Sequence, residues 1–370
     1  MKYEDWLSAR SQTVEISGVR QVFELARSLP NPINLSIGQP HFDVPEPLKN
    51  AAKAAIDAGH NGYTVTQGIP ELLAALQADV QVRFPGQNRA VLVTSGTSGG
   101  LLLALLAAID PGDEVIIPDP YFVAYPQLVR LVGGSVVIVD TYDDFRLDLN
   151  RLNDAITPRT KAILLSTPAN PTGVVLDTTT QRELAALCQR RGVLLISDEI
   201  YRAFHYDAPP TSPAQYNPEV LVIEGFGKSY GMTGWRLGWT HGPQPLIQTM
   251  TKLQQFTFVC APSIVQYAGV AAMNYDVSAM IADYKRKRDF LVDALKNDYE
   301  FVIPGGAFYL FPKAPRATAT EFVRQALQHQ LLMIPGNVFS RRDTHFRISY
   351  AASDETLHRG IAVLRQLARQ

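Results

Sequence analysis

The stretch that decides the fold runs from Lys161 to Ser197 and reads KAILLSTPANPTGVVLDTTTQRELAALCQRRGVLLIS. Its apolar run at 162–165 predicts a strand, and two prolines keep the loop at 167–173 from forming a helix. Asp177 or Thr178 can cap the helix that follows, and Gly192 ends it. A second apolar run at 193–196 predicts another strand. A strand–helix–strand unit of this kind makes its two strands parallel.

Similar apolar runs extend this pattern along the chain. They predict buried strands at 90–93, 114–117, 135–139 and 220–223, and an apolar helix at 98–109. Beyond about residue 280 the pattern changes to a long charged helix at 283–296, followed by helix, strand and helix. We therefore expect an α/β fold. A large domain with a parallel or mixed sheet would span residues 45–280, and residues 1–44 and 281–370 would form a smaller α+β domain with an N-terminal arm.

Length and composition exclude several classes of protein. A chain of 370 residues suggests two domains or one large one, at roughly 150 residues per domain. Lys and Arg total 34 against 35 Asp and Glu, so no excess charge points to a nucleic acid or an anionic membrane. The longest apolar run, Leu101 to Ile109, is far shorter than the ~20 residues of a membrane span. Cys188 and Cys260 fit neither a disulfide framework nor a zinc site, so we expect a cytoplasmic protein without a metal.

The unusual polar residues all come just past predicted strand ends. Ser95-Gly96-Thr97 follows one strand, Asn170 follows another, Asp198 and Tyr201 follow a third, and Lys228 lies in a glycine-rich stretch after a fourth. In open α/β sheets, ligands bind outside the carboxyl ends of the strands. Polar residues placed at random would be spread over both ends of the sheet. This convergence predicts a ligand site at one edge.

Each of these clusters could bind a ligand, and each could instead have a purely structural role. Small residues such as Gly96 and Thr97 at a helix N-terminus expose N–H groups that suit a phosphate, although a tight turn uses the same residues. Lys228 can form a Schiff base with a carbonyl, and Arg236 can bind a phosphate, unless both are surface cations of a solvated loop. Asp198 ends an apolar strand, so its carboxylate needs a cationic or protonated partner, or it caps the next helix.

One ligand would satisfy all of these groups. It is planar and phosphorylated, and it has a carbonyl for the lysine and a ring nitrogen for the aspartate. Pyridoxal 5′-phosphate has each of these features. The sequence contains neither a GxGxxG fingerprint with an acidic residue ~20 positions on, nor a Walker A motif, so it gives no sign of a nicotinamide dehydrogenase.

Several motifs in a fixed order resemble a known family. They are Tyr63-Thr64 with Gly68 and Glu71-Leu72, Asn170-Pro171-Thr172-Gly173, Asp198-Glu199-Ile200-Tyr201, Lys228 through Gly238, Gly306-Ala307-Phe308-Tyr309, Pro335-Gly336 with Phe339, and Arg347-Ile348-Ser349-Tyr350. With these motifs the chain, from about Ser11 to Leu367, resembles the class I pyridoxal-phosphate aminotransferases of fold type I, especially the bacterial aspartate aminotransferase-like branch. The resemblance implies a three-layer α/β/α large domain with a mostly parallel sheet, and a homodimer with shared active sites.

The resemblance also implies a role for each site residue. Lys228 would form the Schiff base and shuttle the proton in a ping-pong transfer from an L-amino acid to a 2-oxo acid, Asp198 would keep the pyridine nitrogen protonated, and Tyr201 would bond the phenolic oxygen. The other cofactor contacts would come from Ser95, Gly96, Thr97, Phe122, Asn170, Arg236 and, across the dimer, Tyr63. The substrate would be bound by Gly38, Asn170 and Arg347.

Four positions depart from the pattern of that branch. Gly225 and Gly227 stand where hydroxyl residues are common, which implies fewer phosphate contacts. Ser98 stands where a lysine can bind the distal carboxylate of aspartate, so another cation must serve or the substrate is not dicarboxylic. His41 replaces a common acidic residue, and we expect a surface loop histidine there.

Other functions use the same residues. A β-lyase or an aminocyclopropane-carboxylate synthase-like lyase would share the cofactor contacts and differ only around the substrate. A non-catalytic regulator with this fold is the remaining alternative, although Lys228, Asp198 and Arg236 are all present.

Overall fold

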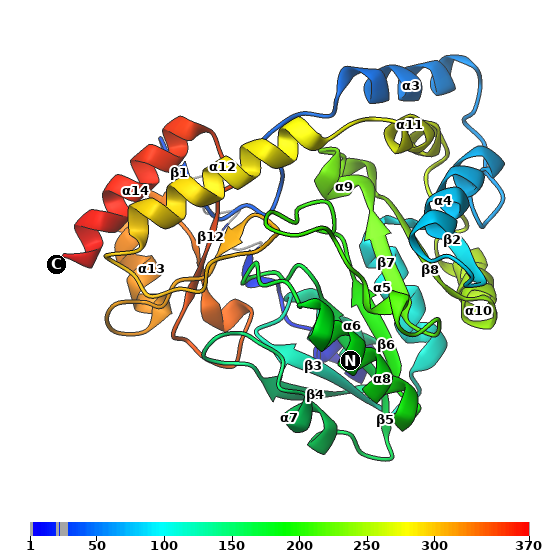
Figure 1. Ribbon diagram of the computed structural model, residues 1–370, viewed down its shortest axis with the longest axis horizontal. Helices are drawn as coiled ribbons and strands as arrows, with labels where there is room; N and C mark the ends of the chain where they lie inside the picture. The colour runs from blue at the N-terminus through cyan, green and yellow to red at the C-terminus, as the bar shows by residue number, and fades with distance from the viewer. Residues whose placement is uncertain (1–2, 20–21, 23–28, 370) are drawn as a thin grey trace.

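A seven-stranded sheet forms the centre of the molecule (Figure 1). The computed structural model describes residues 3–19, 22 and 29–369. Across the sheet the strands are β2 (Arg89–Ser95), β8 (Leu237–Pro243), β7 (Leu221–Gly225), β6 (Leu194–Asp198), β5 (Thr160–Ser166), β3 (Glu114–Asp119) and β4 (Ser135–Asp140). The strands predicted from the apolar runs are all confirmed.

Strand β8 is the one member of this sheet that the sequence analysis does not predict. It pairs antiparallel with both β2 and β7, whereas the pairs from β7 through β4 are parallel. Its sequence, LGWTHGP, includes two glycines and a proline, which are weak strand formers. The sheet is therefore mixed but mostly parallel, as the family resemblance implies.

Side chains alternate between the two faces of the sheet and form two separate cores. Leu92, Ile117 and Ile196 pack with α5 (Gly96–Ala108), α6 (Ala124–Leu131) and α10 (Gln244–Thr257). Val93, Ile116 and Leu195 pack on the other face, with α4 (Pro70–Arg83), α7 (Leu149–Asp154), α8 (Thr178–Arg191) and α11 (Ser263–Met273). This arrangement confirms the three-layer α/β/α architecture. Helix α3 (Glu46–Asp57) packs beside α11.

The βαβ unit has the predicted boundaries. Helix α8 begins after Asp177, whose side chain accepts from the N–H of Thr180, and it ends at Gly192, which has a φ of 64°. Helix α5 begins at Gly96, two residues earlier than predicted. The short elements of this part of the chain are α9 (Phe226–Ser229), η2 (Pro213–Gln215) and η3 (Thr233–Trp235).

A second group of elements packs at one end of the sheet. It contains α12 (Ser278–Leu295), β9 (Tyr309–Leu310), α13 (Ala319–Gln328), β10 (Leu331–Leu332), β11 (Ile334–Pro335), η4 (Gly336–Val338), β12 (Phe346–Ser349) and α14 (Asp354–Ala368). Strand β1 (Ile33–Asn34) joins this group by pairing with β10, and Figure 1 shows α12 and α14 lying beside each other at its outer side. The charged helix predicted at 283–296 is α12. The domain boundaries at residues 45 and 280 stay a prediction.

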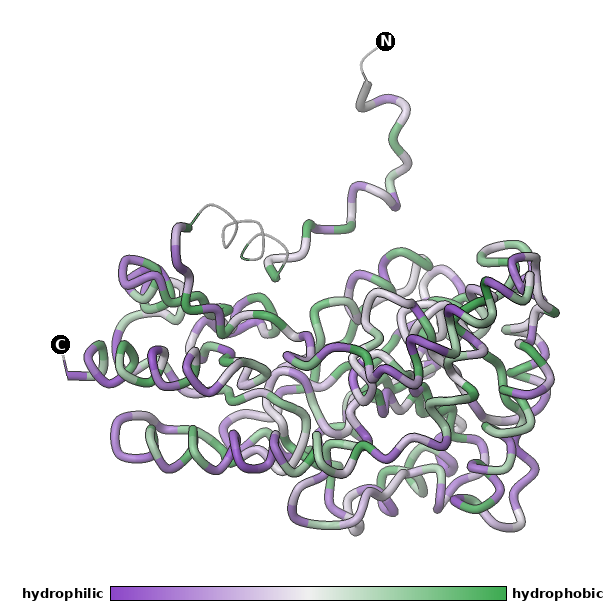
Figure 2. The backbone as a smooth tube through the Cα atoms, turned by 90° about the horizontal axis from the view of Figure 1, so that it is seen from above, coloured by the Kyte–Doolittle hydropathy of each residue, from purple (hydrophilic) through white to green (hydrophobic). Residues whose placement is uncertain are grey.

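The N-terminal segment contains η1 (Tyr3–Trp6) and α1 (Ala9–Gln12). It reaches the body at α6, where the Glu15 N–H donates to Gln127 Oε1 at 3.0 Å. Figure 2 shows this segment, from Tyr3 onward, standing out from the rest of the molecule. In the described part of the chain, no helix combines the length and the apolar composition needed to cross a membrane.

Candidate active site

A cleft of about 1050 Å³ opens at the carboxyl edge of the central sheet. Thr97, Asn170, Asp198 and Lys228, which follow four different strands, all line it. The parallel direction of β5, β6 and β7 brings three of these residues to the same edge, and β2 points the same way. The structure thus gathers the four polar clusters into one cavity.

The first cluster forms a cradle for an anion. Gly96 begins α5 with a φ of 68°, and a Cβ there would come 2.6 Å from Nη2 of Arg236. A Cβ on Gly238 would come 2.5 Å from the backbone carbon of Gly96. The absence of these side chains lets the helix N-terminus, with Thr97 on the cleft, approach the guanidinium closely. N–H groups, the helix dipole and a cation then face one point, which suits a phosphate.

Asp198 lies at the end of β6 and is 3% exposed. Its Oδ2 accepts from the hydroxyl of Tyr125 at 2.8 Å, and its Oδ1 accepts from the N–H of Ile200 at 3.1 Å. Burial raises the pKa of Asp198 to about 6, although both hydrogen bonds and the charge of Lys228 act in the opposite direction. A buried carboxylate of this kind favours a cationic N–H group beside it.

Lys228 reaches the cleft from α9. Its Nζ donates to the carbonyl of Gly38 at 2.5 Å and lies 5.8 Å from the centre of the Tyr201 ring. Burial lowers the pKa of Lys228 to about 8, and the positive charges of Arg347 and Arg236 lower it further, against the charge of Asp198. A neutral amine near physiological pH is nucleophilic, so the site prepares Lys228 to react with a carbonyl.

Arg347 lies on β12 and is 2% exposed. Its Nη1 donates to Asn170 Oδ1 at 2.9 Å and its Nη2 donates to the carbonyl of Ser36 at 2.7 Å. The guanidinium lies between the rings of Tyr309 and Phe339, with its Cζ 4.4 and 4.6 Å from their centres. A guanidinium has five N–H donors, and the two hydrogen bonds use two of them. Its Nε is buried and has no hydrogen-bond partner, so Arg347, which lines the cleft, keeps free donors for an anion there.

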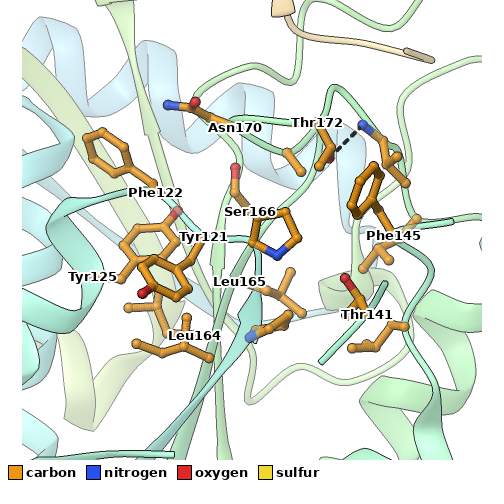
Figure 3. Close-up of a pocket in the computed structure, with 17 residues that line it drawn as sticks. Tyr121, Phe122, Tyr125, Thr141, Phe145, Leu164, Leu165, Ser166, Asn170 and Thr172 are labelled. Atoms are coloured by element: carbon orange, nitrogen blue, oxygen red, sulfur yellow. Dashed lines mark hydrogen bonds between the residues drawn. The ribbon is translucent and has the colours of Figure 1, made fainter. Parts of the chain in front are cut away.

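One wall of the cleft is aromatic. The rings of Phe122 and Tyr125 meet edge to face with their centres 5.5 Å apart. Figure 3 shows these two side chains with Ser166 and Asn170, which also line a second cavity of about 50 Å³. That cavity is bordered mostly by apolar side chains such as Phe145 and Leu164, so the space beside Phe122 is largely apolar.

Three predicted site residues do not line the cleft. Gly96 contributes backbone only, Ser95 stands as the N-cap of α5 without a side-chain cap bond, and Tyr63 is 87% exposed outside it. The roles of all predicted site residues stay predictions. His41 is an exposed loop residue as expected, with its Nε2 2.7 Å from Lys287 Nζ.

The structure adds residues that sequence reasoning missed. The hydroxyl of Tyr125 holds Asp198, the carbonyl of Ser36 holds Arg347, and the hydroxyls of Tyr201 and Tyr309 are 2.7 Å apart. Tyr309 stands within a quoted motif but had no predicted role, and the other two carry no sequence signal. Arg130 is the remaining cation among the described residues that line the cleft, and its Nη1 lies 3.9 Å from Glu15 Oε1.

Comparison with known proteins identifies the family. Residues 30–364 match the model of the family described as aminotransferase class I and II. The chain belongs to this family. The aminotransferase is 34% identical to the probable aspartate aminotransferase of Methanocaldococcus jannaschii, over 98% of this chain and 99% of that protein. It is 33% identical to aromatic-amino-acid aminotransferase 2 of Thermococcus litoralis, over 98% of both chains.

Solved structures give the same result. The aspartate aminotransferase from Thermus thermophilus with maleate superposes on the present aminotransferase with a TM-score of 0.93, at 34% identity over 98% of this chain and 99% of that chain. The family resemblance inferred from the motifs and the fold class are both confirmed, and the enzyme is a transaminase of the aspartate aminotransferase-like type. Among the described residues, no three His, Cys, Asp or Glu side chains are placed to hold a metal ion.

The lowered pKa of Lys228 gives a measurable reactivity. In the unliganded protein, acylation of Lys228 by acetic anhydride should be half-maximal near pH 8, because only the neutral amine reacts. Peptide mass analysis across a pH series measures it. Asp198→Asn should move the midpoint lower still, since it removes a charge that favours the protonated amine. A midpoint near 10.5, the ordinary value for lysine, would contradict the burial argument.

Proposed function

We propose that this aminotransferase uses pyridoxal 5′-phosphate to move the amino group of an L-amino acid to a 2-oxo acid in two half-reactions. The observation that carries the proposal is the meeting of Lys228, Asp198 and Arg347 with an anion cradle in one cleft. The lysine is half-buried and has its pKa lowered to about 8, and the aspartate is buried beside the same cleft and has its pKa raised to about 6. We further propose a cytoplasmic setting, in keeping with two free cysteines.

The donor set of the cleft fits this cofactor at each of its polar groups. Gly96, Thr97 and Arg236 would hold the phosphate, because the N-terminus of α5 lies beside the guanidinium. Asp198 would hold the protonated ring nitrogen, and Phe122 would stack on the ring. When bound, pyridoxal phosphate supplies a carbonyl that exchanges between amines and a ring that takes up the electron pair freed at the substrate Cα.

The chain's own residues then bind the substrate and move its proton. Arg347 would pair with the α-carboxylate, for which its Nε is still without a partner. Asn170 is held by Arg347 and faces the cleft, so it can bridge substrate and cofactor. Lys228 Nζ is neutral in part of the molecules at pH 7 to 8. It would take the proton from the substrate Cα and give it to the carbonyl carbon of the cofactor. In the second half-reaction Lys228 would move a proton in the opposite direction, to the Cα of the new amino acid, and the enzyme would return to its starting form.

A homodimer completes the proposed site. Tyr63 and Val65 are exposed on a loop that Gln254 of α10 ties down by donating to the carbonyl of Thr66 at 2.7 Å. Phe256, at the end of the same helix, is 89% exposed. Large exposed apolar side chains that lie close together suit contact with a second copy of this chain. Tyr63 of each subunit would then donate to the phosphate bound by the other.

A spectral titration tests the proposed function. Purified protein with pyridoxal phosphate should absorb in the visible range, and at least one single L-amino acid should bleach this band without an acceptor. A 2-oxo acid should restore the band without release of ammonia, whereas a lyase would release ammonia. Aspartate and glutamate are compared with aromatic and aliphatic amino acids, because Ser98 supplies no charge for a distal carboxylate.

Matched variants complete that experiment. Lys228→Ala should lose turnover by ~10³-fold or more, because it removes both the attachment and the proton carrier. Lys161→Ala, an exposed lysine on β5, should behave as the unchanged enzyme. A protein that pyridoxal phosphate cannot tint, or full turnover by Lys228→Ala, would contradict the proposal.

The dimer proposal predicts an effect of a surface hydroxyl. Tyr63→Phe should weaken the binding of pyridoxal phosphate by about 10- to 150-fold, since a hydrogen bond to a charged group contributes ~1.5–3 kcal/mol. Tyr216→Phe, whose ring contacts Arg182 elsewhere on the molecule, should bind as the unchanged enzyme does. Equilibrium dialysis measures the affinity and sedimentation measures the assembly. Unchanged affinity in a dimer would contradict the role of Tyr63, and a monomeric active enzyme would contradict the dimer.

A further inference from the structure

The hydroxyl of Tyr309 lies at the centre of the proposed site, where no role has been given to it. It is 2.7 Å from the hydroxyl of Tyr201, and both side chains are buried. A Cβ on Gly38 would come 2.5 Å from this hydroxyl, so Tyr309 fills the space that the glycine leaves. The carbonyl of the same glycine accepts from Lys228 Nζ. Tyr309 therefore contacts two neighbours of the reactive lysine, Gly38 and Tyr201.

The ring of Tyr309 has a separate contact. The Arg347 Cζ lies 4.4 Å from the ring centre, and the ring of Phe339 lies on the guanidinium as well. A guanidinium over an aromatic face is stabilised by ~0.5–2 kcal/mol when it is desolvated. The hydroxyl and the ring of this one residue thus act on two different parts of the site.

The number of hydrogens on the two phenols determines which of them donates in the bond between Tyr201 and Tyr309. A phenol has one hydrogen to donate and can still accept at its oxygen. If Tyr201 donates its hydrogen to a phenolic oxygen in the cleft, the 2.7 Å bond must be made by the hydrogen of Tyr309. Burial raises the pKa of both phenols, so both keep their hydrogens. The charged groups around the pair are Arg347, Asp198 and Lys228.

We propose that Tyr309 is a positioning residue with two functions. Its hydroxyl donates to Tyr201 and so strengthens the hydrogen bond from Tyr201 to the phenolic oxygen of the cofactor. Its ring holds the guanidinium of Arg347 in place for the substrate carboxylate. The proposal rests on the proposed function, because it assumes the cofactor and the role of Tyr201. Chained hydrogen bonds polarise one another, and a stronger donor to an ionised oxygen favours the ionised form.

The hydroxyl function is tested on the holoenzyme by the pH dependence of the bound cofactor's visible absorbance. Tyr309→Phe should raise the midpoint of this titration by about 0.3–0.7 pH units, given cooperative strengthening of ~10–30% per bond. Tyr350→Phe is the matched control, because its hydroxyl is buried in the same core and donates to the carbonyl of Ala307. This control should leave the midpoint unchanged.

A double variant separates positioning from general damage. Tyr201→Phe should raise the midpoint more than Tyr309→Phe, and adding Tyr309→Phe to it should cause no further shift, because the relay is already broken. Additive shifts would overturn the relay. The relay would also be overturned if the Tyr309→Phe holoenzyme bound the cofactor and titrated with the same midpoint as the unchanged enzyme. The proposed function would still stand in that case.

The ring function is tested by the KM for the amino acid. Tyr309→Phe keeps the ring over Arg347 and should change KM by less than about 2-fold. Tyr309→Leu removes the ring and should raise KM by about 3- to 30-fold. Equal KM values in the two variants would overturn the ring function. A protein that never binds pyridoxal phosphate would overturn the proposed function and this role together.

Discussion

The reversed direction of β8 determines where the anion cradle can form. Six strands of the central sheet point their carboxyl ends to the cleft, and β8 alone begins there. Arg236 directly precedes β8, so the reversal delivers its guanidinium to the edge where α5 starts. A parallel β8 would place Arg236 at the far edge, ~20 Å away at ~3.3 Å per residue. Glycine is needed at positions 96 and 238, because the two backbones are in contact where β2 and β8 meet α5 and leave no space for a side chain.

The second constraint is the removal of water from charged groups. Asp198 and Arg347 are buried and Lys228 is half-buried, and their partners are polar groups and aromatic rings of the protein itself. Desolvation therefore lowers the pKa of the lysine and raises that of the aspartate. Four cationic and two acidic side chains line the described cleft, although the whole chain has a formal charge of −1. Such a site attracts small anions that carry phosphate or carboxylate groups.

The sequence predicts those parts of the structure that depend on local patterns. Apolar runs locate six strands of the sheet, and Asp177 with Gly192 marks both ends of α8. Cluster positions after strand ends are also predictable, because parallel strands share one carboxyl edge. Strand β8 could not be predicted, because its two glycines and its proline are weak strand formers. It forms a strand because it pairs with β2 on one side and β7 on the other.

Contacts between distant residues cannot be read from such patterns. The carbonyl of Ser36 is 311 positions from Arg347, and Tyr125 is 73 positions from Asp198. No local signal specifies that a phenol will meet another phenol, as Tyr201 and Tyr309 do. The role of Tyr63 depends on a second copy of the chain, so neither pattern nor single-chain geometry can establish it.

The attachment of a carbonyl to Lys228 is the central claim, and borohydride reduction tests it most directly. The protein would be incubated with pyridoxal phosphate, reduced so that any lysine–carbonyl bond becomes permanent, digested and mapped by mass spectrometry. The account predicts one dominant modified peptide, the one that contains Lys228. Modification spread over exposed lysines such as Lys161, with the Lys228 peptide unmodified, would contradict it.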